Sequence, residues 1–244
     1  MYQKYIFSAV LVLGTQALHA QFKRSSYFFF QLAPNMQQAL QIEETPVRNM
    51  REIPGRGLTF DAGYSRKIYG NWSIEAGLGG NVYNFIYASP GMRLNMANRP
   101  GPADYILYEE FPFALSLYLA PTYRFRLGQS GYWRVGAGMK VIAPPAAYAA
   151  FSQDYYQEND HVYPHGAIQS RMEFDGALKP VITMFIQKQL ISRWRRLEAG
   201  IILNYNPQPI TEGIFQVHTR DSHSTGTTKF YGSSLGVNVR YSLN

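Results

Sequence analysis

Apolar and polar residues alternate with a period of two in several segments of the chain, which predicts half-buried β-strands. The clearest case is FPFALSLYLAPTYRFRL, residues 111–127, in which the odd positions are mostly large and apolar and the even positions are small or polar. The same alternation predicts seven further strands, over residues 25–33, 58–68, 72–86, 133–141, 178–190, 197–205 and 235–243. The strand over 25–33 is aromatic on both sides and its pattern is less regular.

The connections between these strands alternate in length. Short turns are expected at 70–71, 128–131 and 191–194, the first a Gly-Asn pair that suits a two-residue hairpin. Long links are expected at 34–56, 88–110, 145–176 and 206–230. Short turns and long links therefore lie at opposite ends of an up-and-down meander. In the last long link, EGIFQVHT and TGTTKFYG can extend the seventh and eighth strands, whereas 145–176 is expected to be a loop.

The composition indicates which side of each strand faces outward. Charged residues make up only 16% of the chain and hydrophobic ones 46%, yet no apolar run is long enough for a membrane helix. The polar faces combine glycine with charged residues, as the narrow interior of an eight-stranded barrel requires. A solvent-facing surface gains nothing from so many glycines, because each weakens a strand. These features favour a transmembrane barrel with its apolar face toward lipid over a soluble barrel with an apolar interior.

The three tryptophans support this orientation. Each follows a short turn, where the chain re-enters the membrane, and tryptophan prefers the membrane–water interface. Trp194 is one residue out of phase with the strand that follows it, so a bulge or a turn is expected there. The alternative is that these aromatics are core plugs at one end of the barrel. The aromatics expected at the interface are Tyr69, Trp72, Tyr123, Phe125, Trp133, Trp194 and Tyr241. Arg66 and Lys188 interrupt the apolar faces near the same turns, where they can reach lipid headgroups.

Charged residues on the inward faces form the strongest polar constellation. We expect the following to line the lumen: Asp61, Glu75, Arg124, Arg126, Arg134, Lys140, Arg196, Glu198 and Arg240. Because an unpaired buried charge is unfavourable, these groups must pair, which indicates a structural plug that fixes strand register. An ion-conducting lumen is the alternative. Pairing leaves an excess of arginine unexplained, and inward arginines are poorly placed to bind lipid phosphates.

Other chemistry is weakly indicated. The sequence DHVYPH places His161 and His165 beside Asp160, but in a loop, so no metal site and no cofactor is predicted. Asp221, Ser222 and His223 are adjacent, and adjacent side chains point in different directions, which argues against a catalytic triad. Nucleic acid is not an expected partner. The Tyr, Asp and Asn side chains of the 145–176 loop suit an adaptable contact with a protein or a glycan, or a solvated loop without a partner.

Residues 1–20 are typical of a signal peptide, with Lys4 before an apolar stretch and Ala20 as the expected last residue before cleavage. The predicted mature domain is then residues 21–244. The absence of cysteine rules out a lipid anchor of the lipoprotein type, and no disulfide supports the fold.

The final strand carries the most specific motif, polar-x-Gly-x-x-apolar-x-aromatic, at Ser234, Gly236, Val239 and Tyr241. With the strand count and the connection lengths, it resembles the small outer-membrane β-barrel proteins of the OmpA/OmpX/OmpW-like group, although the chain continues to Asn244. The resemblance covers the mature chain. It implies an all-β, eight-stranded antiparallel up-and-down transmembrane β-barrel with short periplasmic turns and long extracellular loops, in the outer membrane of a Gram-negative-type bacterium. It also implies outer-membrane lipid and the barrel-assembly machinery as partners, and a non-enzymatic role. A lipid-modifying enzyme and a narrow ion pore remain the alternatives.

Overall fold

The computed structural model describes residues 26–45, 51–89, 106–110, 113–128, 131–154, 167–190, 196–218 and 223–243. The fold is all-β. Within these ranges no helix is long and apolar enough to cross a membrane. The predicted signal peptide lies outside the described residues, and it stays a prediction together with the domain boundary at residue 21.

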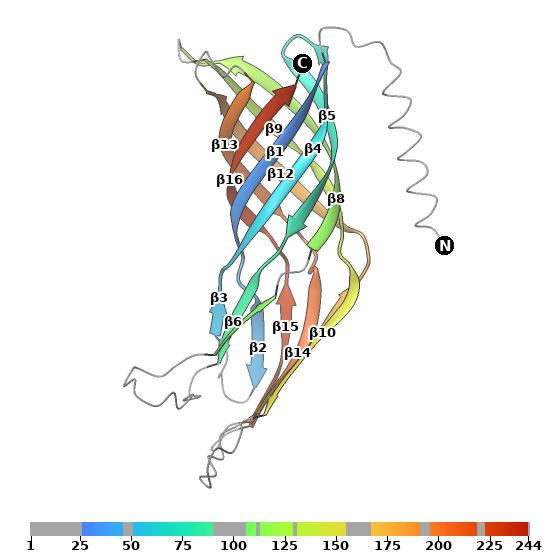
Figure 1. Ribbon diagram of the computed structural model, residues 1–244, viewed down its shortest axis with the longest axis vertical. Helices are drawn as coiled ribbons and strands as arrows, with labels where there is room; N and C mark the ends of the chain where they lie inside the picture. Colours follow the sequence, from blue (N-terminus) through green and yellow to red (C-terminus); the bar gives the residue numbers. More distant parts are fainter. Residues whose placement is uncertain are drawn as a thin grey trace, which may run out of the picture.

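Eight antiparallel strands form a closed barrel, which confirms the predicted fold class (Figure 1). In order around the barrel they are β1 (Ser26–Gln37), β16 (Ser234–Leu243), β13 (Leu197–Tyr205), β12 (Lys179–Gln189), β9 (Tyr132–Ala143), β8 (Phe113–Arg126), β5 (Trp72–Val82) and β4 (Gly55–Tyr69). Pairing of β1 with both β4 and β16 closes the sheet, so no barrel edge is left open. Gly70 has a φ of 54°, the left-handed conformation that the predicted Gly-Asn hairpin requires.

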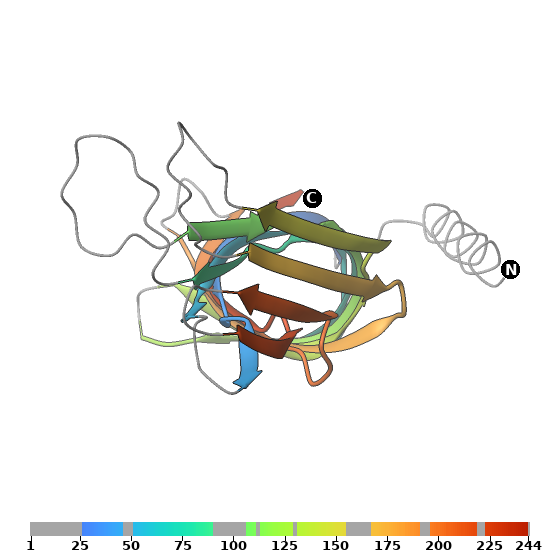
Figure 2. The same cartoon turned by 90° about the horizontal axis from the view of Figure 1, so that it is seen from below.

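The long links are not plain loops. Five strands form a second sheet that continues beyond one end of the barrel: β10 (Ala146–Asp154), β11 (Ala167–Asp175), β14 (Thr211–His218), β15 (His223–Phe230) and β2 (Gln41–Thr45). A three-stranded sheet contains β3 (Arg51–Ile53), β6 (Phe85–Ser89) and β7 (Ile106–Glu110). We call these two sheets the extension; Figure 2 views them from below, with the barrel behind.

Two predictions about this region need correction. The predicted strand 72–86 ends at Val82, and the chain from Phe85 onward joins β3 and β7 as β6. The segment 145–176 was predicted to be a loop, but β10 and β11 pair along nine residues each. Both corrections have one cause: strands that continue beyond the barrel still find hydrogen-bonding partners, because neighbouring strands also continue past the same end. The predicted extensions over 212–219 and 225–232 are found as β14 and β15, which pair with each other.

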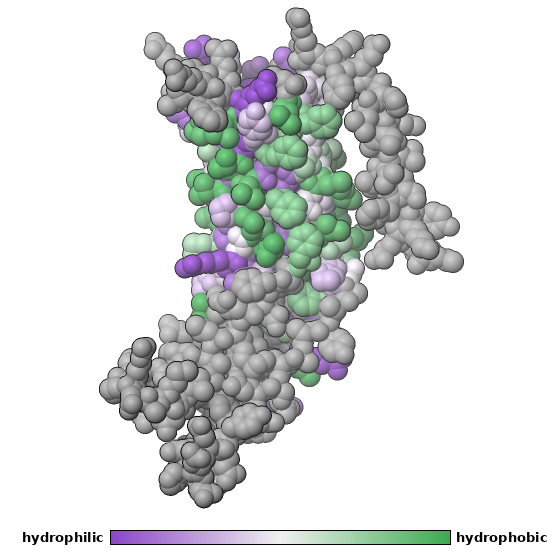
Figure 3. Space-filling view, in the orientation of Figure 1, coloured by the Kyte–Doolittle hydropathy of each residue, from purple (hydrophilic) through white to green (hydrophobic). Residues whose placement is uncertain are grey.

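Side chains on the barrel strands point as the alternation predicts. All eight strands expose large apolar side chains on the outside, mostly leucine, isoleucine, valine and phenylalanine and, on β9, Met139, whereas the polar positions are buried inside. Figure 3 shows this apolar band on one face of the barrel. The barrel strands contain between 9 and 15 residues, and a tilted strand needs about 9–11 residues to cross a bilayer. Length and polarity therefore both match a membrane-spanning barrel.

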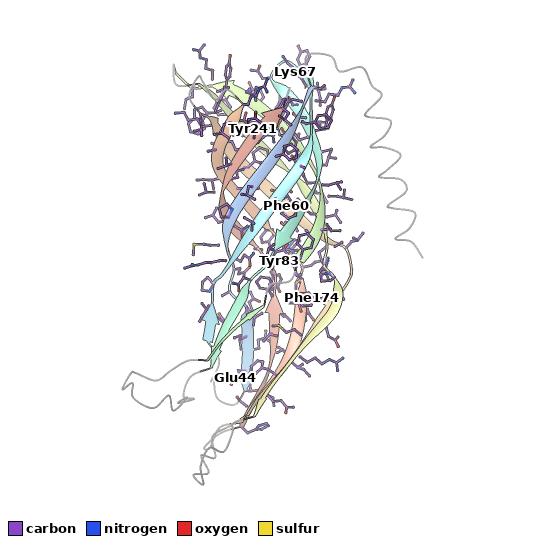
Figure 4. The ribbon with its side chains drawn as sticks, viewed as in Figure 1. Glu44, Phe60, Lys67, Tyr83, Phe174 and Tyr241 are labelled. Carbon is purple, nitrogen blue, oxygen red and sulfur yellow. The ribbon has the colours of Figure 1, made fainter. Side chains whose placement is uncertain are left out.

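An apolar cluster closes the end of the barrel that meets the extension. Ala114, Ile142 and Val181 come from inward positions of barrel strands, and they pack in one buried cluster with side chains of the extension. The extension contributes Ile42, Met172, Phe174, Phe215 and Phe230, and the connections between the barrel and the extension contribute Leu40, Tyr83 and Ile210. Figure 4 shows Tyr83 and Phe174 at this junction. Burial raises the pKa of the Tyr83 phenol well above its ordinary value, so the side chain stays neutral. We call this set the mouth cluster.

Candidate functional site

Glu75 is the centre of the luminal charge network. Its carboxylate accepts two hydrogen bonds from Arg240, at 2.7 and 2.8 Å, and one from Nη1 of Arg134. The Tyr118 hydroxyl donates a further bond at 3.1 Å. Glu75 and Arg240 are completely buried, and 2% of Arg134 is exposed. These residues come from β5, β16, β9 and β8, so the contacts connect strands across the barrel rather than only along one hairpin.

Glu198 continues the network toward the short-turn end. Its carboxylate lies 2.8 Å from Nε of Arg134 and 3.8 Å from Nε of Arg240. Arg124 donates a hydrogen bond to the other carboxylate oxygen at 2.8 Å. The Arg124 side chain is 41% exposed, so this last pair lies where the lumen opens to solvent. Two carboxylates and three guanidinium groups thus share one connected set of ion pairs.

A separate ion pair lies in the middle of the lumen. The Lys140 ammonium group donates hydrogen bonds to both carboxylate oxygens of Asp61, at 2.9 and 2.8 Å. Both residues are almost fully buried. They belong to β9 and β4, which are not neighbours in the barrel, so this pair spans the interior.

Two of the predicted luminal arginines do not lie in the lumen. Arg126 and Arg196 are exposed, at the last residue of β8 and in the turn before β13. The prediction was wrong for these two because alternation places a side chain on a face but does not say where the barrel interior ends. Their removal from the network resolves the apparent excess of arginine: the remaining cations are matched by Asp61, Glu75 and Glu198 to within one charge.

Each buried cation also lies over an aromatic ring. The guanidinium carbon of Arg240 is 3.6 Å from the Phe29 ring centre, that of Arg134 is 5.0 Å from Phe185, and the Lys140 nitrogen is 5.7 Å from Tyr118. These are cation–π distances, and such contacts strengthen when they are removed from water. The rings fill the space between the ion pairs.

Inward glycines on neighbouring strands make room for these rings. A Cβ atom at Gly136 would lie 2.4 Å from the Phe185 ring, and one at Gly63 would lie 2.6 Å from the Phe29 ring. Gly77 has the same relation to Tyr118, at 2.8 Å. The sequence pattern suggested that glycine makes space for charged side chains. The structure shows that an aromatic ring lies between the glycine and the charged side chain. The alternation alone did not identify Phe29 and Phe185 in this role.

Amide and hydroxyl side chains fill the remainder of the lumen. Gln187 donates a hydrogen bond to Gln31 at 3.0 Å, and Thr59 links Asn35 to Asn81 with bonds of 3.2 and 3.0 Å. With the ion pairs and the mouth cluster, these contacts leave the lumen lined from end to end by packed side chains. The arrangement favours structural stabilisation over conduction.

The predicted interface aromatics gather at the short-turn end. Trp72 packs against Tyr123 at a ring distance of 4.9 Å, Tyr123 stacks on Phe125 at 6.2 Å, and Lys188 lies 5.5 Å from the Trp133 ring. Tyr69 and Tyr241 are exposed on the outside at the same end. The Trp133 indole nitrogen is buried and finds no hydrogen-bond partner among the described residues. Trp194 lies outside the described residues.

The remaining candidate residues are placed as follows. Ser234 and Gly236 of the predicted assembly signal point into the barrel, and Val239 and Tyr241 point outward. His223 lies in β15, in register with His218 of β14, while His161, His165, Asp221 and Ser222 lie outside the described residues. In the part of the chain that the structure describes, no three metal-binding side chains come together.

Comparison with known proteins gives weak likeness and no family. No family model matches the chain, and no curated protein sequence matches it. Among solved structures it is similar to Neisserial surface protein A, with 8% identity, a TM-score of 0.34, and coverage of 89% of this chain and 99% of that one. It is also similar to a major outer membrane protein from Thermus thermophilus (12%, 0.38, 89% and 99%) and to the outer membrane protein AlkL (10%, 0.39, 92% and 93%). Because these sequence identities and TM-scores are low, the architecture of this chain is assigned from its own strand pairing.

Proposed function

We propose that this chain is a non-enzymatic outer-membrane β-barrel with a closed lumen, and that its extension forms an interaction surface outside the cell. One observation carries the proposal: apolar side chains face outward on all eight strands, while the interior holds paired charges. A water-soluble protein of this size would expose far less contiguous apolar surface, whereas a lipid-embedded barrel requires it.

The lumen supports a structural role rather than transport. Ion pairs occupy it near the short-turn end and in the middle, and the mouth cluster closes the opposite end. Eight strands enclose a space just wide enough for side chains, so little volume remains for a permeating ion. Breaking the buried pairs to admit an ion would leave unpaired charges, which is strongly unfavourable.

The proposed orientation places the short turns in the periplasm and the extension outside the cell. In this scheme the signal peptide is removed on export, and the barrel-assembly machinery inserts the barrel by its last strand. The five-stranded sheet of the extension exposes mostly polar side chains, among them Arg171, Glu212 and Thr227. A hydrogen-bonded sheet provides a firmer contact surface for a protein or a glycan than the predicted loops. Nothing in the described residues favours the lipid-modifying enzyme over this role.

Single-channel recording tests the closed lumen. The full chain, with insertion verified by co-flotation with vesicles, is expected to give no steady current in a planar bilayer. A stable open level whose current scales with the applied voltage would contradict the proposal. Failure to co-float with vesicles would refute membrane insertion itself, so the two parts of the proposal are tested separately.

A further inference from the structure

Acidic and basic residues are distributed unevenly over three regions of this chain: the long links, the lumen and the short hairpins. Thirteen of the sixteen acidic residues lie in the four long links defined above, and the other three are the luminal Asp61, Glu75 and Glu198. The short hairpin segments 66–72, 124–133 and 188–196 contain eight basic residues and no acidic residue. The short hairpin segments therefore have no acidic side chain of their own outside the lumen to neutralise their basic side chains.

Among the described residues, the basic side chains at this end are accessible. Arg66, Lys67, Arg126 and Arg196 are exposed, and Lys188 is half-buried beside Trp133. We call these five residues the collar. Arg66 and Lys188 continue the apolar outer faces of β4 and β12, whereas the other three lie on the rim. Figure 4 shows Lys67 and Tyr241 together at this end.

From this arrangement we infer that the collar binds the phosphate groups of anionic phospholipids in the leaflet at the short-turn end. The inference rests on the proposed membrane insertion and names the lipid class that the barrel selects. The complementary charge, the apolar band directly beside it and the aromatic side chains at the same level fit a phospholipid, with its acyl chains on the band and its phosphate at the collar. A soluble polyanion would use the cations but not the band and the aromatics.

The tryptophans provide a built-in reporter, because all three belong to the short hairpins by sequence. The full chain is reconstituted into vesicles that contain either brominated phosphatidylglycerol or brominated phosphatidylcholine, each diluted with the same unlabelled lipids. Bromine quenches tryptophan on contact, so the ratio of quenching gives the relative affinity for the anionic lipid. We expect a preference for phosphatidylglycerol of about fivefold, the factor that one cation contributes near an anionic surface. The preference should fall as salt screens the charges.

The collar variant replaces Arg66, Lys67, Arg126 and Arg196 with glutamine, and leaves Lys188 in place so that the surroundings of Trp133 are unchanged. It should lose the preference. The matched control replaces four cations at the other end of the barrel and on the extension, Arg56, Arg171, Lys179 and Lys229, and should retain it. Six of these eight side chains are exposed, Lys229 is half-buried, and the Lys179 side chain is 12% exposed and ion-paired with Asp175. Circular dichroism verifies that each variant is folded.

The outcomes separate the two proposals. Three outcomes would overturn the inference that the collar binds anionic phospholipids. They are equal quenching by both lipids, a preference that survives in the collar variant, and a preference that is lost equally in the control. Quenching by neither lipid would refute membrane insertion. A preference for phosphatidylglycerol that is abolished by an added soluble polyphosphate without loss of quenching by phosphatidylcholine would assign the collar to soluble polyanions and overturn its lipid role.

Discussion

Replacing Glu75 with glutamine removes the anion at the centre of the luminal network while preserving its shape. Glu75 is completely buried and accepts two hydrogen bonds from Arg240 and one from Arg134, which are themselves buried. Glutamine keeps one acceptor oxygen, so part of the hydrogen bonding survives but the charge compensation does not. Removing one partner of a buried ion pair costs about 3–5 kcal/mol because the other charge is left uncompensated. We expect E75Q to lower the free energy of unfolding by that amount.

The double variant E75Q/R240Q distinguishes charge compensation from simple loss of contacts. It removes one anion and one cation, so Arg124, Arg134 and Glu198 retain the original charge balance. We expect the double variant to lose about 2 kcal/mol less unfolding free energy than the two single variants lose in sum. This difference is within the range of coupling energies for residues in one network. Urea unfolding of the chain in detergent micelles, followed by tryptophan fluorescence, measures all three variants.

The matched control is E173Q in the extension. Glu173 forms an ion pair with Arg171 at 2.8 Å, but both side chains are more than half exposed, so its loss should cost less than about 1 kcal/mol. If E75Q were no more destabilising than E173Q, or if the effects of E75Q and R240Q were simply additive, the luminal network would not stabilise the barrel in the way we describe.

Two further predictions concern packing and pH. G136A inserts a methyl group against the Phe185 ring and should cost about 1–3 kcal/mol; G136A/F185L should cost less than the sum of the single changes in the same urea assay, and additive effects would contradict the proposed clash. In the extension, the Lys179 side chain and the Ala177 backbone N–H donate hydrogen bonds to Asp175 and lower the pKa of its carboxyl below the ordinary 3.8. The stabilisation by Asp175 is fully present above pH 3.8 and is lost as the pH falls through the lowered pKa, so D175N should weaken the extension slightly at neutral pH and less at pH 2. An equal effect at both values, measured by proteolysis of the extension, would refute the assignment.

The barrel could be predicted from the sequence because each strand has one lipid face and one luminal face. That difference produces the strict alternation in residues such as Leu117 and Tyr118, or Val239 and Arg240, whose side chains are exposed and buried as expected. Burial in the lumen then requires the charges to pair, so the existence of a network followed from the pattern as well. The choice of partners did not, because it depends on which strands face each other across the barrel.

The extension was harder to predict because its strands do not cross a membrane. Met172 and Phe174 alternate with Arg171 and Glu173 over only a few residues, a pattern that also occurs in loops. Their partners lie far away in the sequence, since β11 pairs with β14 and β15 pairs with β2. Such non-local pairing is visible only when the barrel has already brought the long links to one end.

The luminal rings explain how a narrow barrel can hold so many charges. Each buried cation has three neighbours: a carboxylate that compensates its charge, a ring that covers its flat face or its ammonium group, and, beneath that ring, a glycine on the adjacent strand. The set Gly63, Phe29 and Arg240 on β4, β1 and β16 shows the order most clearly, because these are three successive strands of the barrel. The glycine allows the ring to lie against the wall, and the ring displaces water from the cation, which strengthens its attraction to the carboxylate. Size complementarity and charge compensation therefore depend on each other, and a substitution at the glycine is expected to disturb the ion pair two strands away.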